Sequence, residues 1–288
     1  NSGRRQRQMC IRDRLKCAGS SISEYDMDIP SSLTAEEILI RSGNIGSIKI
    51  AQKVGLENYR KFLEDLDLIN KIQFDIDEIG TPISFKWGKC KLATSAYGHG
   101  ITTTPLQLAK AYAIISNGGY KIRPTLLKRK ENLKKREQII SEDNSKKINN
   151  ILRKIVTSEE GTANLANIAG HEIAGKTGTA QKSIGGKYSK KKINTFASIF
   201  PISSPKYVLI VILDEPKLSK DYVYSYNDGK ERKIVGTPFN TAGWTSVEVA
   251  KNIIEKIAVS YTHLTLPTPE LLLCGGGGGG VEGGGGGG

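Results

Sequence analysis

Four consecutive residues, Lys176, Thr177, Gly178 and Thr179, could together bind a peptide carboxylate. They lie within residues 171–181, whose pattern predicts a β-strand. The Lys176 ammonium can attract a carboxylate and lower the pKa of a neighbouring basic group. Both threonine hydroxyls can bind that carboxylate, and Gly178 allows a substrate backbone to lie against the strand edge. With the Thr179 backbone N–H as a candidate oxyanion-hole donor, the set fits acyl transfer. An ordinary edge-strand lysine beside a flexible glycine would have the same sequence.

A second polar motif, Ser42-Gly43-Asn44, directly follows a predicted helix. The Ser42 hydroxyl and the Asn44 amide could face one cavity. Glycine and asparagine are also typical of a helix C-terminus. Taken alone, the motif is therefore better explained as a polar helix end.

Capping patterns predict that the first half of the chain is helical. Thr34 and Glu37 form a capping-box pattern ahead of a short helix that ends at Arg41. Thr104 followed by Pro105 predicts another helix start. Apolar periodicity predicts further helices over residues 45–54, 56–66, 141–161 and 244–257.

Strand patterns dominate the second half and complete the prediction of an α+β fold. Strands are expected over residues 171–181, 194–201 and 206–213. The short connection at residues 203–205 predicts that the last two strands form an antiparallel hairpin. The third strand lacks polar alternation, so we expect it to be buried on both faces. Helices followed by strands and a closing helix predict an antiparallel sheet flanked by helices.

Composition gives no support for nucleic-acid binding or metal chemistry. The 288 residues contain 42 Lys and Arg against 29 Asp and Glu, a net charge of +13. These charges are spread along the chain without aromatic interleaving, so no nucleic-acid partner is expected. Cys17 and Cys90 lack the spacing of a zinc site or a disulfide framework, and the three histidines are isolated. We therefore expect no metal and no cofactor, and the sequence contains no long apolar membrane span.

The order of the two motifs resembles that of a known family. Ser42-Gly43-Asn44 precedes Lys176-Thr177-Gly178, as the S-D-N-type motif precedes K-T-G in penicillin-binding proteins and class A β-lactamases. From about residue 15 to residue 257 the chain is most similar to class B penicillin-binding proteins. Residues 238–244 resemble the ending of the cell-division enzyme rather than its elongation paralogue. Other similar segments are residues 97–101, 103–109, 179–181, 200–201, 207–208 and 214–216.

This resemblance implies a penicillin-binding/β-lactamase-like transpeptidase fold and a peptidoglycan D,D-transpeptidase activity in septal cell-wall synthesis. A serine would attack a D-Ala-D-Ala stem peptide, or a β-lactam in its place, without a cofactor. Ser42 would help move a proton toward the leaving group, Asn44 would bind the substrate amide or orient the catalytic lysine, and Lys176 would supply positive potential. Thr177, Gly178 and Thr179 would bind the substrate and its terminal carboxylate.

The family's nucleophile motif, Ser-x-x-Lys, has no counterpart where the resemblance places it, between Leu15 and Arg41. Two formal matches, residues 189–192 and 203–206, follow the K-T-G motif and are not expected to be helical. The chain thus has no nucleophile in the expected place, and we predict that it cannot form an acyl-enzyme by itself.

Both ends of the chain resemble translated sequencing-adapter text. We expect residues 1–14 and the glycine-rich residues 259–288 to be artefacts, and residues 15–258 to be a transpeptidase domain lacking its N-terminal part. The resemblance implies an intact protein with a membrane anchor, at the periplasmic face of the bacterial inner membrane, with divisome membrane proteins as partners. A true pseudoenzyme is the alternative to truncation.

Two other functions remain open from the sequence. A serine β-lactamase or D,D-carboxypeptidase would share the K-T-G motif, but residues 238–244 favour the division-type enzyme. A non-catalytic penicillin-recognising sensor or divisome scaffold would keep the pocket without turnover. An intact Ser-x-x-Lys motif upstream of Leu15 would support the enzyme over the scaffold.

Overall fold

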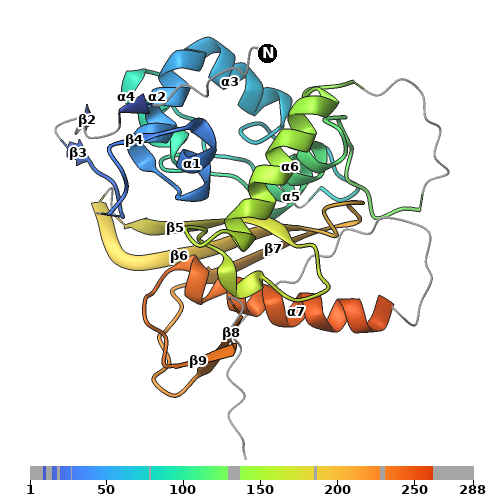
Figure 1. The fold of residues 1–288 in the computed structure, drawn as a ribbon. Helices are drawn as coiled ribbons and strands as arrows, with labels where there is room; N and C mark the ends of the chain where they lie inside the picture. The colour runs from blue at the N-terminus through green and yellow to red at the C-terminus, as the bar shows by residue number, and fades with distance from the viewer. Residues whose placement is uncertain are drawn as a thin grey trace, which may run out of the picture.

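The protein is described here by a computed structural model in which a central antiparallel sheet lies between helical layers (Figure 1). Helix α7 (Ser246–Tyr261) contacts the sheet from one side, and α5 (Pro105–Ser116) and α6 (Glu142–Thr157) contact it from the other. The expected α+β class is confirmed. The described residues are 9–10, 15–17, 20–26, 28–77, 79–128, 137–184, 187–227 and 231–261.

Three strands form the central sheet in the order β5-β6-β7. They are β5 (Ala174–Ile184), β6 (Lys187–Phe200) and β7 (Tyr207–Asp214), and both pairings are antiparallel. The predicted hairpin is thus confirmed, and β5 lies at an edge of this sheet. The start of β6 was predicted too late, at residue 194. Its pairing with β5 continues through the lysine-rich residues down to Lys187, where no hydrophobic pattern indicates a strand.

The main hydrophobic core lies between the sheet and the helices. Residues 208–211 of β7 are buried as expected, but Ile212 is 41% exposed, so the prediction that the whole strand is buried was wrong. The fully buried side chains of this core include Ile155, Ile173, Phe196, Ile199, Leu209 and Ile254. This core fixes the strand that carries Lys176.

Helix boundaries follow the capping residues. Helix α1 (Ala35–Ile40) begins with the predicted Thr34–Glu37 capping box, and α5 begins with a second box between Thr104 and Gln107. Ser141 caps α6, which ends at Thr157, earlier than expected. Helices α2 (Asn44–Val54) and α3 (Leu56–Asp65) meet at Gly55, as the sequence predicts.

Several short elements were not predicted. Helix α4 (Lys89–Ala96) and the hairpin of β8 (Val223–Asn227) with β9 (Glu231–Val235) are the largest. The others are β1 (Met9–Cys10), β2 (Leu15–Cys17), β3 (Ser20–Ile22), β4 (Ser32–Leu33), η1 (Asn164–Ala166) and η2 (Ala242–Trp244). These elements are too short to show a hydrophobic period.

Parts of both supposed artefacts belong to regular elements. Strand β1, within the first fourteen residues, pairs with β4, and α7 extends to Tyr261. The rest of the expected C-terminal artefact, residues 262–288, lies outside the described residues.

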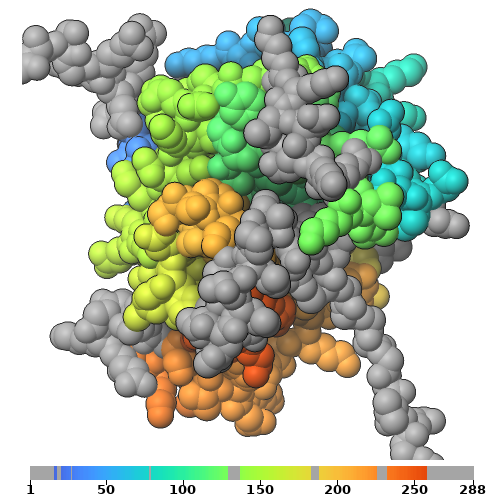
Figure 2. Space-filling view, turned by 90° about the vertical axis from the view of Figure 1, so that its right-hand side faces the viewer, coloured from blue at the N-terminus to red at the C-terminus, as the bar shows by residue number. Residues whose placement is uncertain are grey.

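The helical half, from β2 to α6, lies on one side of the sheet, and α7 with the β8–β9 hairpin lies on the opposite side (Figure 1). In the space-filling view the blue and green segments of the first half occupy the top, and most of the orange and red surface lies at the bottom (Figure 2). Among the described residues no helix is long and apolar enough to cross a membrane. Within the same residues, no group of three or more His, Cys, Asp or Glu side chains is placed to hold a metal ion.

Candidate active site

The structure brings Ser42 and Lys176 together, although 134 residues separate them. The Lys176 ammonium Nζ donates to Ser42 Oγ at 2.8 Å and to the Thr177 carbonyl at 3.0 Å. Lys176 is half-buried, and desolvation lowers its pKa from 10.5 to about 8. The site therefore holds a cation that can give up its proton near neutral pH, with a serine hydroxyl in contact with it.

Ser42 has a strained backbone that follows from how α1 ends. Its φ is 59°, in the left-handed region that favours glycine. The Ser42 N–H donates to the Leu39 carbonyl, and the Gly43 N–H donates to the Ile38 carbonyl. This pair of bonds is the Schellman arrangement, in which glycine usually occupies the position that Ser42 has here. A serine at a glycine position, with its exposed hydroxyl on Lys176, is consistent with a functional role for that hydroxyl.

Asn44 begins α2 beside Ser42, but its amide nitrogen turns to another segment. Nδ2 donates to the Ser23 carbonyl at 2.9 Å, which uses one of the two amide protons. The backbone N–H groups of Asn44 and Ile45 donate to the two carboxylate oxygens of Glu24, at 2.6 and 2.8 Å. Residues 23 and 24 thus hold the first turn of α2, a contact that the sequence did not suggest.

The two threonines of the Lys176 motif are anchored by residues from other elements. Thr177 Oγ1 lies 2.6 Å from Thr162 Oγ1, and either hydroxyl can be the donor. Thr179 Oγ1 accepts the Ala242 N–H at 2.9 Å, which leaves the Thr179 hydroxyl proton available to another acceptor. Gly243 is packed so closely that a Cβ there would lie 2.7 Å from the Thr162 carbonyl oxygen.

The two glycines of β5 differ in their surroundings. A Cβ on Gly175 would lie 2.6 Å from the Ala197 carbonyl oxygen and 2.7 Å from the Phe196 ring, so packing alone requires glycine. A Cβ on Gly178 would meet nothing nearer than Thr195 Cβ at 4.0 Å. Internal packing therefore does not explain Gly178, and the open space above it is consistent with a ligand backbone along the edge of β5.

Residues 238–244 brace the sheet beside the site. Asn194 of β6 is fully buried, and its Nδ2 contacts Asn240 Oδ1 and Thr245 Oγ1, each at 2.9 Å. Lys192 donates to the Asn240 carbonyl at 2.9 Å. With the bond from Ala242 to Thr179, these contacts attach the segment to both β5 and β6. The resemblance pointed to this segment, but its contacts were not predictable from spacing.

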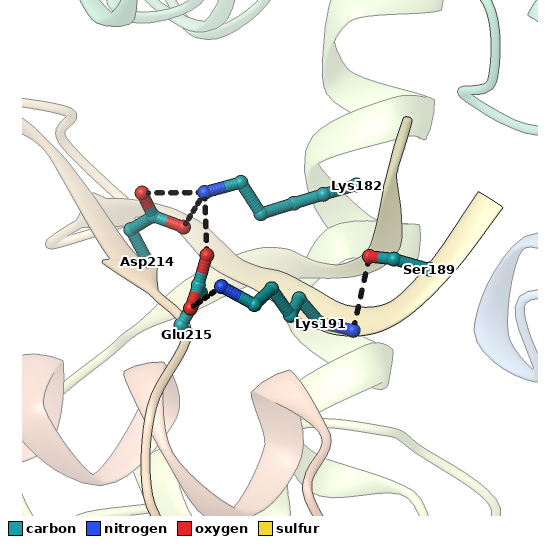
Figure 3. A network of polar contacts seen from close by, with 5 residues as sticks. All are labelled: Lys182, Ser189, Lys191, Asp214 and Glu215. Carbon is teal, nitrogen blue, oxygen red and sulfur yellow. Dashed lines mark hydrogen bonds and ion pairs between the residues drawn. The ribbon is translucent and has the colours of Figure 1, made fainter. Parts of the chain in front are cut away.

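Charged side chains tie the three strands together at the β5–β6 turn end of the sheet (Figure 3). Lys182 of β5 contacts Asp214 of β7 at 2.9 Å and Glu215 at 2.9 Å, and Lys191 of β6 also contacts Glu215 at 2.9 Å. Interaction with the two lysines lowers the pKa of Glu215. The network gives Asp214 and Glu215 oppositely charged partners at the end of β7.

Neither Ser-x-x-Lys run is helical. Residues 189–192 lie within β6, where Ser189 Oγ accepts the Lys191 N–H at 3.2 Å and Lys192 turns to Asn240. Residues 203–206 form the connection from β6 to β7. The expectation that neither run is helical is confirmed.

Residues 97–101 lie between α4 and α5 and contact the sheet. The Tyr97 and His99 ring centroids lie 4.8 Å apart, and His99 packs edge-on against Tyr188 of β6 at 5.9 Å. Desolvation lowers the pKa of His99, so the neutral ring is favoured at this junction. These contacts explain the aromatic character of the segment without a catalytic role for His99.

Comparison with known proteins identifies related sequences. The family model described as "Penicillin binding protein transpeptidase domain" matches residues 10–239. The chain is 29% identical over 237 residues to "Probable peptidoglycan D,D-transpeptidase FtsI" of Caulobacter vibrioides, covering 78% of this chain and 38% of that protein. It is 34% identical over 196 residues to "Stage V sporulation protein D" of Bacillus subtilis, covering 63% and 30%. The chain thus spans less than half the length of these two relatives.

Solved structures share the fold. The apo transpeptidase domain of penicillin-binding protein 3 from Burkholderia pseudomallei matches with a TM-score of 0.71 and 23% identity, covering 89% of this chain and 71% of that one. Penicillin-binding protein 3 from Mycobacterium tuberculosis, complexed with ampicillin, matches with a TM-score of 0.73 and 21% identity, covering 92% and 59%. At these identities the likeness establishes the arrangement of helices and strands.

Proposed function

Because the chain belongs to the penicillin-binding protein transpeptidase family, we propose that it supplies the Ser42 and Lys176 sides of a peptidoglycan D,D-transpeptidase site. The contact between Ser42 and Lys176 at 2.8 Å is the observation that carries this proposal. The contact joins two elements from opposite halves of the fold, and it supports our assignment of the Ser42 and Lys176 motifs to the family's second and third motifs. The confirmed resemblance covers the fold and the family.

The proposed reaction exchanges one amide bond for another through a serine ester. The serine oxygen attacks the carbonyl of the penultimate D-Ala, the peptide bond breaks, and D-Ala leaves with the proton that the serine gave up. An amine from a second stem peptide then attacks the ester and regenerates the serine. Lys176 and Ser42 would move the proton between the serine and the leaving group, a step suited to an amine of pKa about 8.

The strand β5 would bind the substrate. Gly178 leaves room for a substrate backbone, and the Thr179 hydroxyl proton is available for the terminal carboxylate. Thr177 would donate to the same carboxylate when Thr162 is the donor in their mutual bond. We further propose that the Asn44 side chain binds the substrate amide through its oxygen, because its nitrogen is engaged by Ser23.

The division role, the partners and the location are part of the same proposal. A relative named FtsI supports a septal enzyme. On this proposal the protein acts at the periplasmic face of the inner membrane with divisome membrane proteins, and β-lactams acylate the same serine. Complementation of an FtsI-depleted strain by the complete gene, with restored septation, is the result this role predicts.

The chemical activity is tested on the complete gene product, read from the source DNA on both sides of this sequence. Incubation with a D-Ala-D-Ala stem peptide and an amine acceptor should release D-Ala and form the new amide, both measured by mass spectrometry. Release of D-Ala without amide formation would instead indicate a carboxypeptidase. Penicillin binding without either product would indicate a sensor or scaffold. The 288-residue chain alone should form no acyl-enzyme, because neither of its Ser-x-x-Lys runs is helical.

A further inference from the structure

The segment of residues 23–26, here called the strap, contacts the Ser42 motif on both sides. Ahead of the motif, Arg41 lies 3.5 Å from the Asp26 carboxylate. At the end of the motif, Asn44 Nδ2 donates to the Ser23 carbonyl, and the Glu24 carboxylate accepts the backbone N–H groups of Asn44 and Ile45. The strap directly follows β3, and its Glu24 precedes Asn44 by 20 residues in the sequence. Its contacts therefore exist only in the folded chain.

Glu24 supplies what the N-terminus of α2 lacks. The N-cap residue of α2 is Gly43, which has no side chain, and no side-chain cap bond is made from that position. The first N–H groups of a helix have no partner within the helix, and they carry a partial positive charge. The negatively charged Glu24 carboxylate accepts both bonds, with one oxygen bound to the Asn44 N–H and the other to the Ile45 N–H. Charge-assisted bonds of this kind are stronger than neutral ones.

The same carboxylate limits where the motif can move. A Cβ on Gly43 would lie 3.2 Å from Ile29 Cδ1 and 3.8 Å from Glu24 Oε1, so the backbone of the motif is close to the strap. Ser42 lies one residue before Gly43 in a strained conformation that the local sequence does not favour. The bonds from Glu24 restrain the backbone two residues after Ser42 from outside α1 and α2.

We propose that Glu24 is a positioning residue of the active site, whose carboxylate holds the start of α2 and thereby places Ser42 and Asn44 against Lys176. The inference rests on the proposed function for its catalytic meaning, whereas the positioning itself is a property of the 288-residue chain. Glu24 acts through Ser42 and Asn44 and has no contact with the reacting atoms. Its removal should loosen the Ser42–Lys176 contact before it unfolds the domain.

The test compares Glu24→Ala, Ser42→Gly and a matched control in the 288-residue chain. Glu36 is a suitable control because it is a glutamate at the start of α1 that pairs with Lys154, away from the motif. The readout is the titration midpoint of Lys176, followed by NMR of the labelled lysine side chain. Glu24→Ala should move this midpoint in the same direction as Ser42→Gly and by at least half as much, and Glu36→Ala should leave it unchanged. Glu24→Gln, which keeps one acceptor oxygen, should give an intermediate shift.

A Lys176 midpoint that moves in Ser42→Gly but stays at the wild-type value in Glu24→Ala would overturn the inference. A midpoint that moves in neither variant would also overturn it, because the contact that Glu24 is said to hold would then be absent. In the complete gene product, Glu24→Ala should slow acylation by penicillin about tenfold, a size expected of a small misplacement of a catalytic group. In an Asn44→Ala background the same change should cost less than about threefold, since residues that act together are not additive. Failure of the complete wild-type protein to react would reject the proposed function and leave the Lys176 titration as the decisive test of Glu24.

Discussion

The Ser42 motif and the Lys176 motif meet in one contact, yet they are held in place by different means. Lys176 belongs to β5, which is paired with β6 along its length. The main hydrophobic core and the hydrogen bonds to Thr162 and Ala242 also hold this strand. Ser42 lies in a tight junction between two helices, with a left-handed backbone, and depends on the strap. Several independent contacts therefore hold the strand, whereas the junction at Ser42 depends on a few side chains.

Both halves of the contact also carry a cost in stability. Lys176 is an ammonium that is partly removed from water, and Ser42 occupies a position suited to glycine. Strained or desolvated groups of this kind are retained at functional sites because activity needs them. Substitutions at the two motifs should therefore separate stability from activity.

The largest expected effect concerns the two glycines of β5. Gly175→Ala should lower the free energy of unfolding by about 3 kcal/mol or more, because the new methyl group would overlap the Ala197 carbonyl and the Phe196 ring. Gly178→Ala should change it by less than about 1 kcal/mol, because the space is open. Urea denaturation of the two variants provides the comparison. Equal losses would show that Gly178 is a packing glycine and would remove the argument for a ligand above it.

A smaller effect of opposite sign is expected at Lys176. Lys176→Met should raise the free energy of unfolding at pH 7 by about 1 to 3 kcal/mol, because it removes the cost of a desolvated charge and keeps the apolar stem. The folded pKa of about 8 lies below the usual 10.5, so the unfolded chain holds the proton more tightly between these values. The wild type should therefore gain stability between pH 8 and pH 10.5, and the advantage of the variant should shrink over that range. Denaturation at pH 7 and pH 10.5 measures both values, and an advantage that grows with pH would contradict the account.

The smallest effect tests the strain at Ser42. Ser42→Gly and Ser42→Ala both remove the hydroxyl, so their difference reports the left-handed backbone alone. The glycine variant should be more stable than the alanine variant by about 1 kcal/mol, since the backbone penalty exceeds the entropy that glycine adds to the unfolded chain. Thermal or urea denaturation resolves a difference of this size. An alanine variant that is equally stable would mean that the junction is relaxed.

Much of the fold could be predicted because it depends on local signals. The Thr34 and Thr104 capping boxes fix the starts of α1 and α5, and the apolar run of β7 identifies a strand whose residues 208–211 are buried. The β8–β9 hairpin and α4 were missed because these elements are too short to show a hydrophobic period. For the site, the residue types indicated the chemistry, and the resemblance to a family indicated that Ser42 and Lys176 belong together.

The supporting residues could not be predicted, since their contacts arise only when distant segments fold together. Glu24 follows β3 without a recognisable motif, and Thr162 lies in a turn between α6 and η1. A carboxylate that caps a helix in the same segment leaves a spacing signal, as Glu37 does in α1. A carboxylate that caps a helix twenty residues away leaves none.

The central claim is that Lys176 serves a serine acyl transfer, and the acylation rate of the complete gene product by a fluorescent penicillin tests it most directly. We predict a covalent adduct on the serine of a helical Ser-x-x-Lys motif. The second-order rate constant should fall by about 10² to 10³ in Lys176→Ala, as expected when electrostatic stabilisation of an acyl-transfer site is lost. Absence of the adduct, or an adduct that forms equally fast in Lys176→Ala, would contradict the account.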